Sequence, residues 1–254
     1  VADSASDEEK IEACRDVEAI IMVAASISVD VLKSCPKVKL LQGIGAGFDK
    51  VDVKAINALG IPYANNGGSN AIPVAEFTLS LITGIARGVF RGIQNAKEGN
   101  WNSGLRETPS WEITGKCIGI IGMGAIGQRV ARMLVGYDCD TVYYKRHRLS
   151  SELERKLHAR YLPLNELLQI SDVVTMHNSL NSSTIGMIGR EQLAMMKPSS
   201  FLINTTRGAC IDQQALYESL IDGRIAGAGL DVLEQEPTPR DNPLWQLNNV
   251  VIPP

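Results

Sequence analysis

The chain has 254 residues, 44% of them hydrophobic, which is enough for two modest domains that each bury a core. Its formal net charge of -3 gives no overall basic field, so attraction to nucleic acid or to an anionic membrane is not expected. Five scattered cysteines without a CxxC pair argue against a disulfide framework and a metal cluster, and with no apolar run of membrane-span length they predict a cytoplasmic protein.

Short runs rich in Val and Ile alternate with longer amphipathic stretches from residue 18 onward, which is typical of an α/β fold with parallel sheets. Three runs predict the strands of a first domain, residues 1–85: EAIIMV (18–23), VKLLQG (38–43) and IPYAN (61–65). One long helix is predicted from near Pro73 through residue 96, where it would join two domains.

A second alternating series follows the turn-rich segment 99–116 and predicts a second domain, residues 86–254. Its predicted strands are CIGII (117–121), TVYY (141–144), DVVTMH (172–177), SFLIN (200–204), IAGAGLD (225–231) and VVI (250–252). Six strands with helices between them suit a doubly wound, dinucleotide-binding Rossmann sheet.

The loop GMGAIG lies directly between the strand CIGII and a helical pattern, and it fits G-x-G-x-x-G. Gly122 permits the tight turn, Gly124 lets the backbone approach a pyrophosphate, and Gly127 allows close packing of helix on strand. Ala125 and Ile126 would offer first-turn amides to the same phosphates. The motif alone is weak, but its position between strand and helix makes a dinucleotide site the favoured interpretation.

The strand TVYY ends in Lys145, Arg146, His147 and Arg148, at the place where an acidic residue would hold the ribose hydroxyls of NAD. Cations pair well with a 2′-phosphate, so this end of the strand predicts NADP, with NAD still possible. The alternative interpretation is a solvated basic turn, which is the usual role of a charge run.

Arg207 follows the apolar strand SFLIN, so we expect it at a carboxyl strand end, where a guanidinium can clamp a substrate carboxylate and polarise a carbonyl. A surface salt bridge is its commoner role. Glu236 and Asp231 carry weight only through this neighbourhood, since Asp231 could simply cap a turn. His177 ends a strand, and a hydrogen-bonded structural role is favoured over proton transfer.

Taken in order, these segments resemble the D-isomer-specific 2-hydroxyacid dehydrogenases, a family that includes phosphoglycerate dehydrogenase, glyoxylate/hydroxypyruvate reductase and D-lactate dehydrogenase. The resemblance covers nearly the whole chain. It is carried by GIGAGFDKVD, NAIPVAE, GKCIGIIGMGAIG, KPSSFLINTTRGACID, DGRIAGAGLDVLEQEP and NVVIPP. It implies a flavodoxin-like substrate domain beside a Rossmann cofactor domain, an active site in the cleft, and a homodimer formed largely through the cofactor domains.

The resemblance also implies roles for single residues. Arg207 is similar to the family's substrate-orienting arginine, and Glu236 to the acid that pairs with a catalytic histidine and raises its pKa. Amides of Ala46 and Gly47, in the glycine-rich stretch 42–52, would hold the substrate carboxylate, although a tight turn without a ligand is equally plausible from the residues alone.

Thr205, Thr206 and Asp231 would lie near the nicotinamide, and hydride would pass between its C4 and C2 of the 2-oxo acid. The family's histidine follows a segment like VVIPP, so the resemblance places it directly after Pro254, and it implies a further first strand and closing helix. We expect the parent polypeptide to supply these parts, and the 254 residues alone to bind the cofactor but reduce 2-oxo acids slowly.

Lys145 stands where the family usually has Asp, a change similar to that in the NADP-using glyoxylate/hydroxypyruvate reductases. The sequence therefore favours an NADP-dependent reductase of small 2-oxo acids, with glyoxylate or hydroxypyruvate as substrate. Two alternatives stay open. One is an NAD-linked phosphoglycerate or D-lactate dehydrogenase relative, and the other is a non-catalytic dinucleotide sensor resembling a corepressor, because fold does not fix function.

Overall fold

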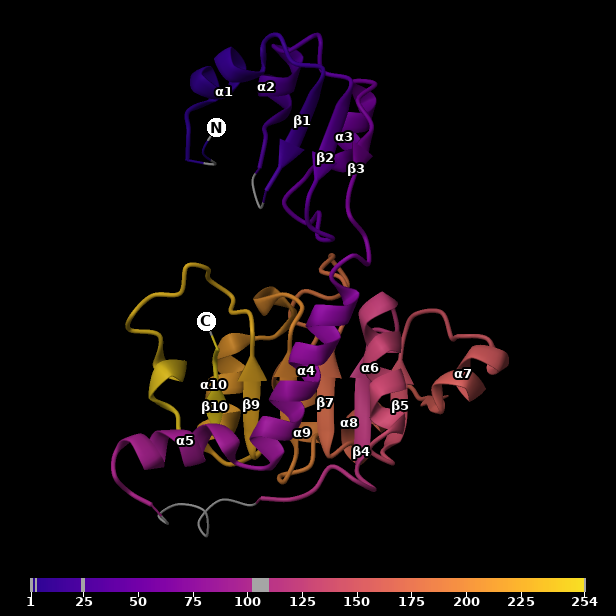
Figure 1. Cartoon of the computed structure of the whole chain (residues 1–254), viewed down its shortest axis with the longest axis vertical. Helices are drawn as coiled ribbons and strands as arrows, with labels where there is room; N and C mark the ends of the chain where they lie inside the picture. The colour runs from indigo at the N-terminus through magenta and orange to yellow at the C-terminus, as the bar shows by residue number, and fades with distance from the viewer. Residues whose placement is uncertain (1, 3, 24–25, 102–109, 254) are drawn as a thin grey trace. The chain divides into compact units, whose positions relative to one another are not determined.

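The computed structural model describes residues 2, 4–23, 26–101 and 110–253 (Figure 1). It divides into two compact units, Val1–Asn70 and Ala71–Pro254. Both are built on parallel sheets with helices between the strands, so the predicted α/β class, with a Rossmann-type second domain, is confirmed. Part of the predicted turn-rich segment 99–116 lies outside the described residues.

The first unit has a parallel sheet of order β1-β2-β3. Its strands are β1 (Ala19–Met22), β2 (Leu40–Gly43) and β3 (Tyr63–Ala64), and its helices are α1 (Asp7–Cys14), α2 (Val29–Lys33) and α3 (Val53–Ala58). Each helix begins where a side-chain oxygen of Ser6, Ser28 or Asp52 accepts a first-turn N–H, which explains why it starts there. The core of the unit comprises Val31, Leu32, Cys35, Val38, Leu41, Ile56 and Ile61.

The second unit has a seven-stranded parallel sheet of order β10-β9-β8-β7-β4-β5-β6. Its strands are β4 (Cys117–Ile121), β5 (Asp140–Tyr144), β6 (Ala159–Tyr161), β7 (Val173–Met176), β8 (Phe201–Asn204), β9 (Gly227–Leu230) and β10 (Val250–Val251). The six predicted strands are present. The sequence pattern missed β6, because three residues at a sheet edge are too few to show a hydrophobic period.

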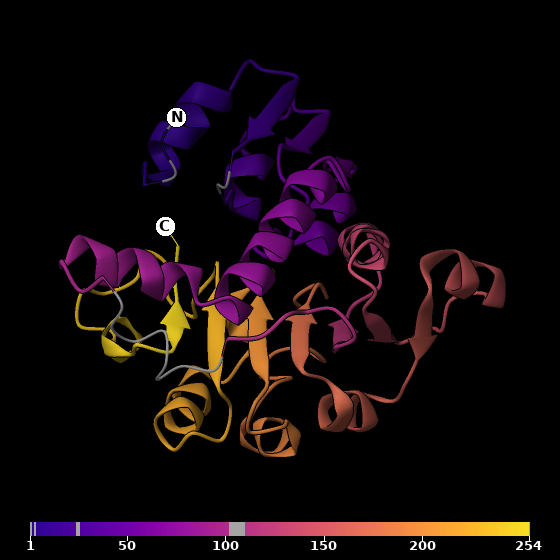
Figure 2. The same cartoon turned by 60° about the horizontal axis from the view of Figure 1, so that its bottom comes forward.

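Helices cover both faces of this sheet (Figure 2). The elements are α4 (Ala71–Ala86), α5 (Val89–Lys97), α6 (Ala125–Val135), α7 (Ser151–Leu157), α8 (Leu164–Ile170), α9 (Arg190–Met195) and α10 (Gln213–Ile221), with 3-10 turns η1 (Gly208–Cys210) and η2 (Pro243–Gln246). Apolar residues of α4 and α6 pack in one core with the sheet, whereas those of α8, α9 and α10 pack in another. The sheet is therefore buried on both sides, as a doubly wound fold requires.

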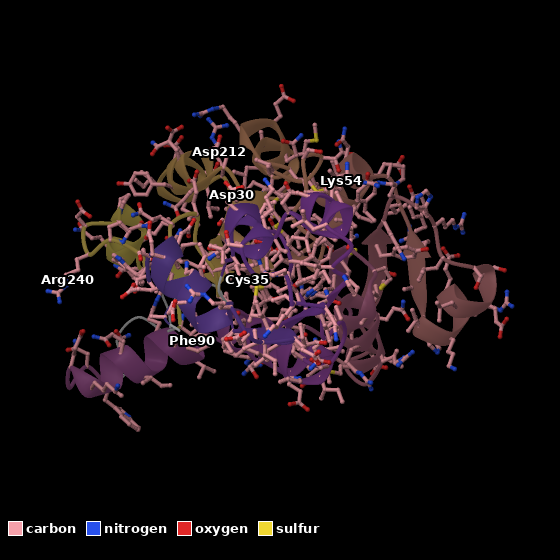
Figure 3. All side chains as sticks on the ribbon, turned by 90° about the horizontal axis from the view of Figure 1, so that it is seen from above. Asp30, Cys35, Lys54, Phe90, Asp212 and Arg240 are labelled. Atoms are coloured by element: carbon pink, nitrogen blue, oxygen red, sulfur yellow. The ribbon has the colours of Figure 1, made fainter. Side chains whose placement is uncertain are left out.

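The single long helix predicted through residue 96 is two helices, α4 and α5, bent by 67°. The break lies at Gly88, whose φ of +66° is left-handed and unfavourable for other residues. The bend brings the ring of Phe90 (labelled in Figure 3) against Gly84, where an added Cβ would come within 2.4 Å of the ring. The bend is thus possible because Gly84 and Gly88 have no side chain.

Helix α4 belongs to the second unit, so the division falls after Asn70 and not after residue 85, where the sequence had placed it. The physical reason is burial: Ala75, Leu81, Ile82 and Ala86 of α4 are almost fully buried in the core that contains Ile118. Leaving a helix with this apolar face outside that core would expose the whole face to water.

Candidate functional site

Strand register aligns the predicted site residues of the second unit in one row. Ile121 of β4 pairs with Tyr144 of β5 and with Met176 of β7, while Asn204 of β8 pairs with Met176 and with Leu230 of β9. The residues that follow these positions therefore leave the sheet at one level, at its carboxyl edge: Gly122, Lys145, His177, Thr205 and Asp231. The order of strands reverses between β4 and β7, which is where such sheets bind ligands.

The glycine loop has the geometry that its motif requires. Gly122 has φ +96°, and an added Cβ would lie 2.4 Å from the amide nitrogen of Asn178. A Cβ on Gly127 would lie 2.2 Å from the carbonyl oxygen of Gly122, so helix α6 can pack on its strand only with glycine there. A Cβ on Gly124 would meet nothing within 4 Å, which leaves that backbone open to an approaching group.

Helix α6 begins directly at this loop. Its N-cap, Gly124, has no side chain to accept hydrogen bonds from the first-turn amides, which include those of Ala125 and Ile126. Such amides and the positive end of the helix dipole favour a phosphate. Together with the open backbone at Gly124, they form a loop that fits the pyrophosphate of a dinucleotide.

The basic side chains that follow β5 differ in their contacts. Lys145 is half-buried and, within the described part of the chain, makes no ion pair, while Arg146 is exposed and donates a hydrogen bond to Ser183 Oγ at 3.2 Å. Arg148 is different, because its Nε and Nη2 each donate to a carboxylate oxygen of Glu154 at 2.8 Å. The edge therefore presents two cations to a ligand and not the three that the sequence offered.

His177 ends β7 as a buried, neutral side chain. Its Nε2 lies 3.0 Å from Thr175 Oγ1, and its Nδ1 has no hydrogen-bond partner among the described residues. Burial lowers the pKa of His177 to about 3, because the charged imidazolium loses its hydration. The ring is therefore neutral at physiological pH, and its burial and its contact with Thr175 fit the structural role that we predicted.

The turn after β8 is shaped by Asn204, a fully buried residue that the sequence analysis did not single out. Its Oδ1 accepts hydrogen bonds from the amide and hydroxyl of Thr206, at 3.0 and 2.8 Å, and its Nδ2 donates to Arg207 O at 3.0 Å. Thr205 Oγ1 lies 3.1 Å from Thr78 Oγ1 of α4. Both predicted threonine hydroxyls are thus used within the protein, where they fix the backbone of the turn.

Arg207 follows this turn as a half-buried side chain with an extended backbone (φ -146°, ψ 138°). Its Nη1 donates to Thr206 O at 2.8 Å, which restrains one branch of the guanidinium at the carboxyl edge of the sheet. Asn204 holds the backbone of the turn from which Arg207 extends. The sequence signal for Asn204 was a polar residue at the end of an otherwise apolar strand, FLIN.

The loop that carries Glu236 packs directly on the turn that carries Arg207. A Cβ added to Gly208 would lie 1.9 Å from the carbonyl carbon of Leu233, so the two backbones are in contact there. Glu236 Oε1 accepts a hydrogen bond from Leu233 N at 3.1 Å. Burial, and then the charge of Glu236, raise the pKa of Asp231, so these two carboxylates lie close enough to interact.

Replacing Gly208 by alanine is expected to destabilise the protein by about 3 kcal/mol, because backbone cannot yield to a new methyl group as a flexible side chain would. Thermal or urea unfolding measures this loss. Gly136→Ala is the matched control, since Gly136 has φ -70° and an added Cβ would come no closer than 3.6 Å to Met133 O. Equal stability of the two variants would contradict the packing described for these loops.

In the first unit, a glycine-rich loop that contains the predicted Ala46 and Gly47 follows β2. Asn65 Nδ2 donates to Ala46 O at 2.7 Å, and Asn66 N donates to Gly45 O at 3.2 Å, so the carbonyls of the loop are held from one side. Among the described residues, the amides of Ala46 and Gly47 donate no hydrogen bond. This arrangement leaves two backbone donors available to an anion.

Among the described residues, no group of three or more His, Cys, Asp or Glu side chains is arranged to hold a metal ion. Within the same residues, no single helix has the length and apolar character to cross a membrane, although the bent pair of α4 and α5 has them in combination.

Known proteins resemble this chain over most of its length. The family model for the D-isomer specific 2-hydroxyacid dehydrogenase, NAD binding domain, matches residues 79–254. Glyoxylate reductase of Korarchaeum cryptofilum is 38% identical over 247 residues, which are 96% of this chain and 74% of that protein. D-3-phosphoglycerate dehydrogenase of Methanocaldococcus jannaschii is 34% identical over 253 residues, 99% of this chain and 48% of that protein. A solved acyclic imino acid reductase in complex with NADPH and D-Arg has a TM-score of 0.87 at 31% identity, covering 98% and 78% of the two chains.

Proposed function

Because the chain belongs to the D-isomer-specific 2-hydroxyacid dehydrogenases, enzymes that transfer hydride between a nicotinamide cofactor and a 2-oxo or 2-hydroxy acid, we propose that it is an NADP-preferring reductase of glyoxylate or hydroxypyruvate. The observation that carries the cofactor part is the pair Lys145 and Arg146 at the carboxyl end of β5. Residues 145–148 include no carboxylate that could bind the ribose hydroxyls, whereas Lys145 and Arg146 are cations that can pair with a 2′-phosphate.

The substrate part of the proposal is supported by the similarity to glyoxylate reductase and by the site chemistry. Arg207 can hold the carboxylate of a 2-oxo acid with two parallel hydrogen bonds and polarise the neighbouring carbonyl oxygen. In the first unit, the amides of Ala46 and Gly47 make no hydrogen bond among the described residues and are donors of the kind that bind a carboxylate. Glu236 is proposed to pair with the histidine that transfers the proton, and so to raise its pKa.

For the cofactor, the glycine loop and the first turn of α6 would hold the pyrophosphate, while Lys145 and Arg146 would hold the 2′-phosphate. Thr205, Thr206 and Asp231 would lie beside the nicotinamide, which supplies the hydride when it is bound. Asn204 would contribute by fixing the turn that carries the two threonines and Arg207.

The proposal includes a cytoplasmic location and a homodimer. Scattered free thiols support the first, because oxidising compartments favour paired cysteines. Exposed apolar side chains of α5 support the second: Val89 is 47% and Ile93 is 50% exposed on a helix with no buried residue. A self-complementary interface would remove such side chains from water.

A panel of 2-oxo acids with both cofactors tests the proposal on the natural full-length protein. We expect glyoxylate and hydroxypyruvate to be reduced, with kcat/KM higher for NADPH than for NADH. Preference for 3-phosphohydroxypyruvate or pyruvate with NADH would favour the alternative, an NAD-linked phosphoglycerate or D-lactate dehydrogenase relative. The similarity to D-3-phosphoglycerate dehydrogenase is the observation that supports this alternative. Cofactor binding without turnover of any acid would favour a dinucleotide sensor instead.

A further inference from the structure

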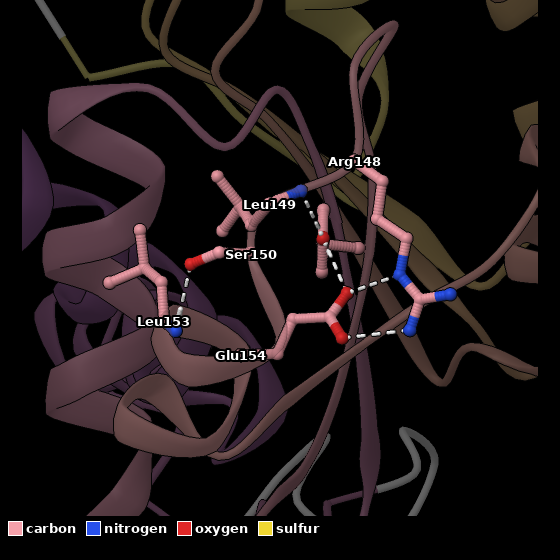
Figure 4. A network of polar contacts seen from close by, with 6 residues as sticks. Arg148, Leu149, Ser150, Leu153 and Glu154 are labelled. Carbon is pink, nitrogen blue, oxygen red and sulfur yellow. Dashed lines mark hydrogen bonds and ion pairs between the residues drawn. The ribbon is translucent and has the colours of Figure 1, made fainter.

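A polar network joins residues that flank Lys145 and Arg146, the two cations of the proposed 2′-phosphate site, in the sequence. Tyr143 is fully buried, and its hydroxyl donates to Glu154 Oε1 at 2.7 Å while accepting from Leu149 N at 2.9 Å. Arg148 donates two hydrogen bonds to the same carboxylate (Figure 4). The carboxylate of Glu154 and the hydroxyl of Tyr143 thus bind the side chain of Arg148 and the backbone amide of Leu149.

The network is well isolated from solvent on the carboxylate side. The side chain of Glu154 is 11% exposed, whereas that of Arg148 is 61% exposed. The guanidinium of Arg148 lies 5.7 Å from the ring centroid of Tyr161, and that ring makes an edge-on contact with Tyr143. Burial and the hydrogen bond to Glu154 raise the pKa of Tyr143 to about 12, so its hydroxyl stays protonated at neutral pH.

The loop between β5 and α7 is held at both ends. At its start, Gly122 N of the glycine loop donates to Tyr144 O at 2.9 Å. At its far end, Arg148 and Leu149 are bound to Glu154 and Tyr143 as described, and Ser150 caps α7 by accepting from Leu153 N at 3.3 Å. Only three residues lie between the two anchors, namely Lys145, Arg146 and His147, and two of them are the proposed phosphate ligands.

We infer that Tyr143, Arg148 and Glu154 form a clamp of positioning residues that fixes Lys145 and Arg146 for a 2′-phosphate and thereby sets the preference for NADPH over NADH. The clamp need not touch the cofactor. A short arch anchored at both ends loses little conformational entropy when it binds, so its cations are pre-organised. This inference rests on the proposed NADP specificity, and it assigns to Arg148 a role different from phosphate binding.

Charge-neutral removal of the clamp tests the inference. The double variant Arg148→Gln with Glu154→Gln removes one positive and one negative charge, so the long-range field at Lys145 and Arg146 is preserved. Its matched control is Asp140→Asn with Arg160→Gln, which removes an ion pair of 3.3 Å between β5 and β6 that is about half exposed on both sides. Tyr143→Phe gives a milder loss that leaves the ion pair in place.

Dissociation constants of NADPH and NADH are measured by nucleotide fluorescence, and loop order by hydrogen exchange of the peptide that contains residues 145–149. For the clamp variants we expect NADPH to bind about tenfold more weakly, NADH to change less than about twofold, and exchange to rise in that peptide. The control pair should leave all three unchanged. Equal losses for both cofactors would reduce the clamp to a purely structural role, and this would overturn the inference.

Three further outcomes test this inference, and the first two separate it from the proposed function. An unaltered preference for NADPH in both clamp variants, although the unsubstituted protein prefers NADPH, would refute the clamp alone. Equal affinities of the unsubstituted protein for the two cofactors would refute the NADP assignment and, with it, the role of the clamp in specificity. Tighter NADPH binding by the single variant Glu154→Gln would also refute it, since Glu154 would then act by withholding Arg148 from the phosphate.

Discussion

Replacing Arg207 by lysine is expected to lower kcat/KM for glyoxylate and hydroxypyruvate by roughly 10²- to 10³-fold, with little change in melting temperature. Lysine keeps the positive charge but lacks the planar fork that grips a carboxylate through two parallel hydrogen bonds. The melting temperature should change little, because Asn204 and the contact between Gly208 and Leu233 hold the turn through backbone and buried groups.

The control for this prediction is Arg190→Lys, which alters a surface ion pair with Glu218 on the same unit and should leave kinetics unchanged. Binding of oxamate, an unreactive analogue of a 2-oxo acid, to the protein with bound NADPH provides a second readout, and Arg207→Lys should weaken it. If the lysine variant reduces both substrates as well as the original protein does, Arg207 does not act on the substrate.

Exchanging the basic end of β5 is expected to reverse the cofactor preference. Lys145→Asp combined with Arg146→Gln removes two charge-assisted contacts worth about 1.5 to 3 kcal/mol each, so NADPH should bind roughly 10- to 150-fold more weakly per contact. The new carboxylate can accept hydrogen bonds from the ribose hydroxyls of NADH, which should therefore bind more tightly. Fluorescence titration with each nucleotide measures both changes.

Arg155→Gln is the matched control for this exchange, because Arg155 is an exposed cation of α7 that lies outside the loop between β5 and α7. It tests whether loss of positive charge anywhere near β5 weakens NADPH binding. If Arg155→Gln weakened NADPH binding to a similar extent, the preference for NADPH would come from the overall positive charge near β5 and not from contacts of Lys145 and Arg146. Unchanged nucleotide affinities in the double variant would show that Lys145 and Arg146 do not contact the 2′-phosphate.

Local chemistry specifies several elements of this fold, and these could be predicted from the sequence. Short apolar runs predicted the principal strands, because a strand buried on both faces must be apolar throughout. The glycine loop was predictable as well, since Gly122 and Gly127 occupy positions where the backbone leaves no room for a Cβ. Arg207 was assigned to a strand end from its neighbours alone.

How these elements come together depends on long-range packing and could not be predicted from the sequence. Register places Gly122, Lys145 and Asp231 at one level across strands that are far apart in sequence, and register depends on packing between strands, which no local pattern contains. The bend at Gly88 and the assignment of α4 to the second unit likewise depend on a ring and a core contributed from elsewhere.

The charge run after β5 is a further feature whose contacts could not be predicted from local sequence. In the sequence, Arg148 is equivalent to Lys145 and Arg146, and no local pattern indicates which carboxylate it contacts. In the folded protein, Arg148 pairs with Glu154 in a hydrogen-bond network that includes Tyr143, whereas Lys145 makes no ion pair within the described residues. A buried carboxylate must be paired, and folding selects its partner, so which cations remain for a phosphate is a property of the tertiary structure.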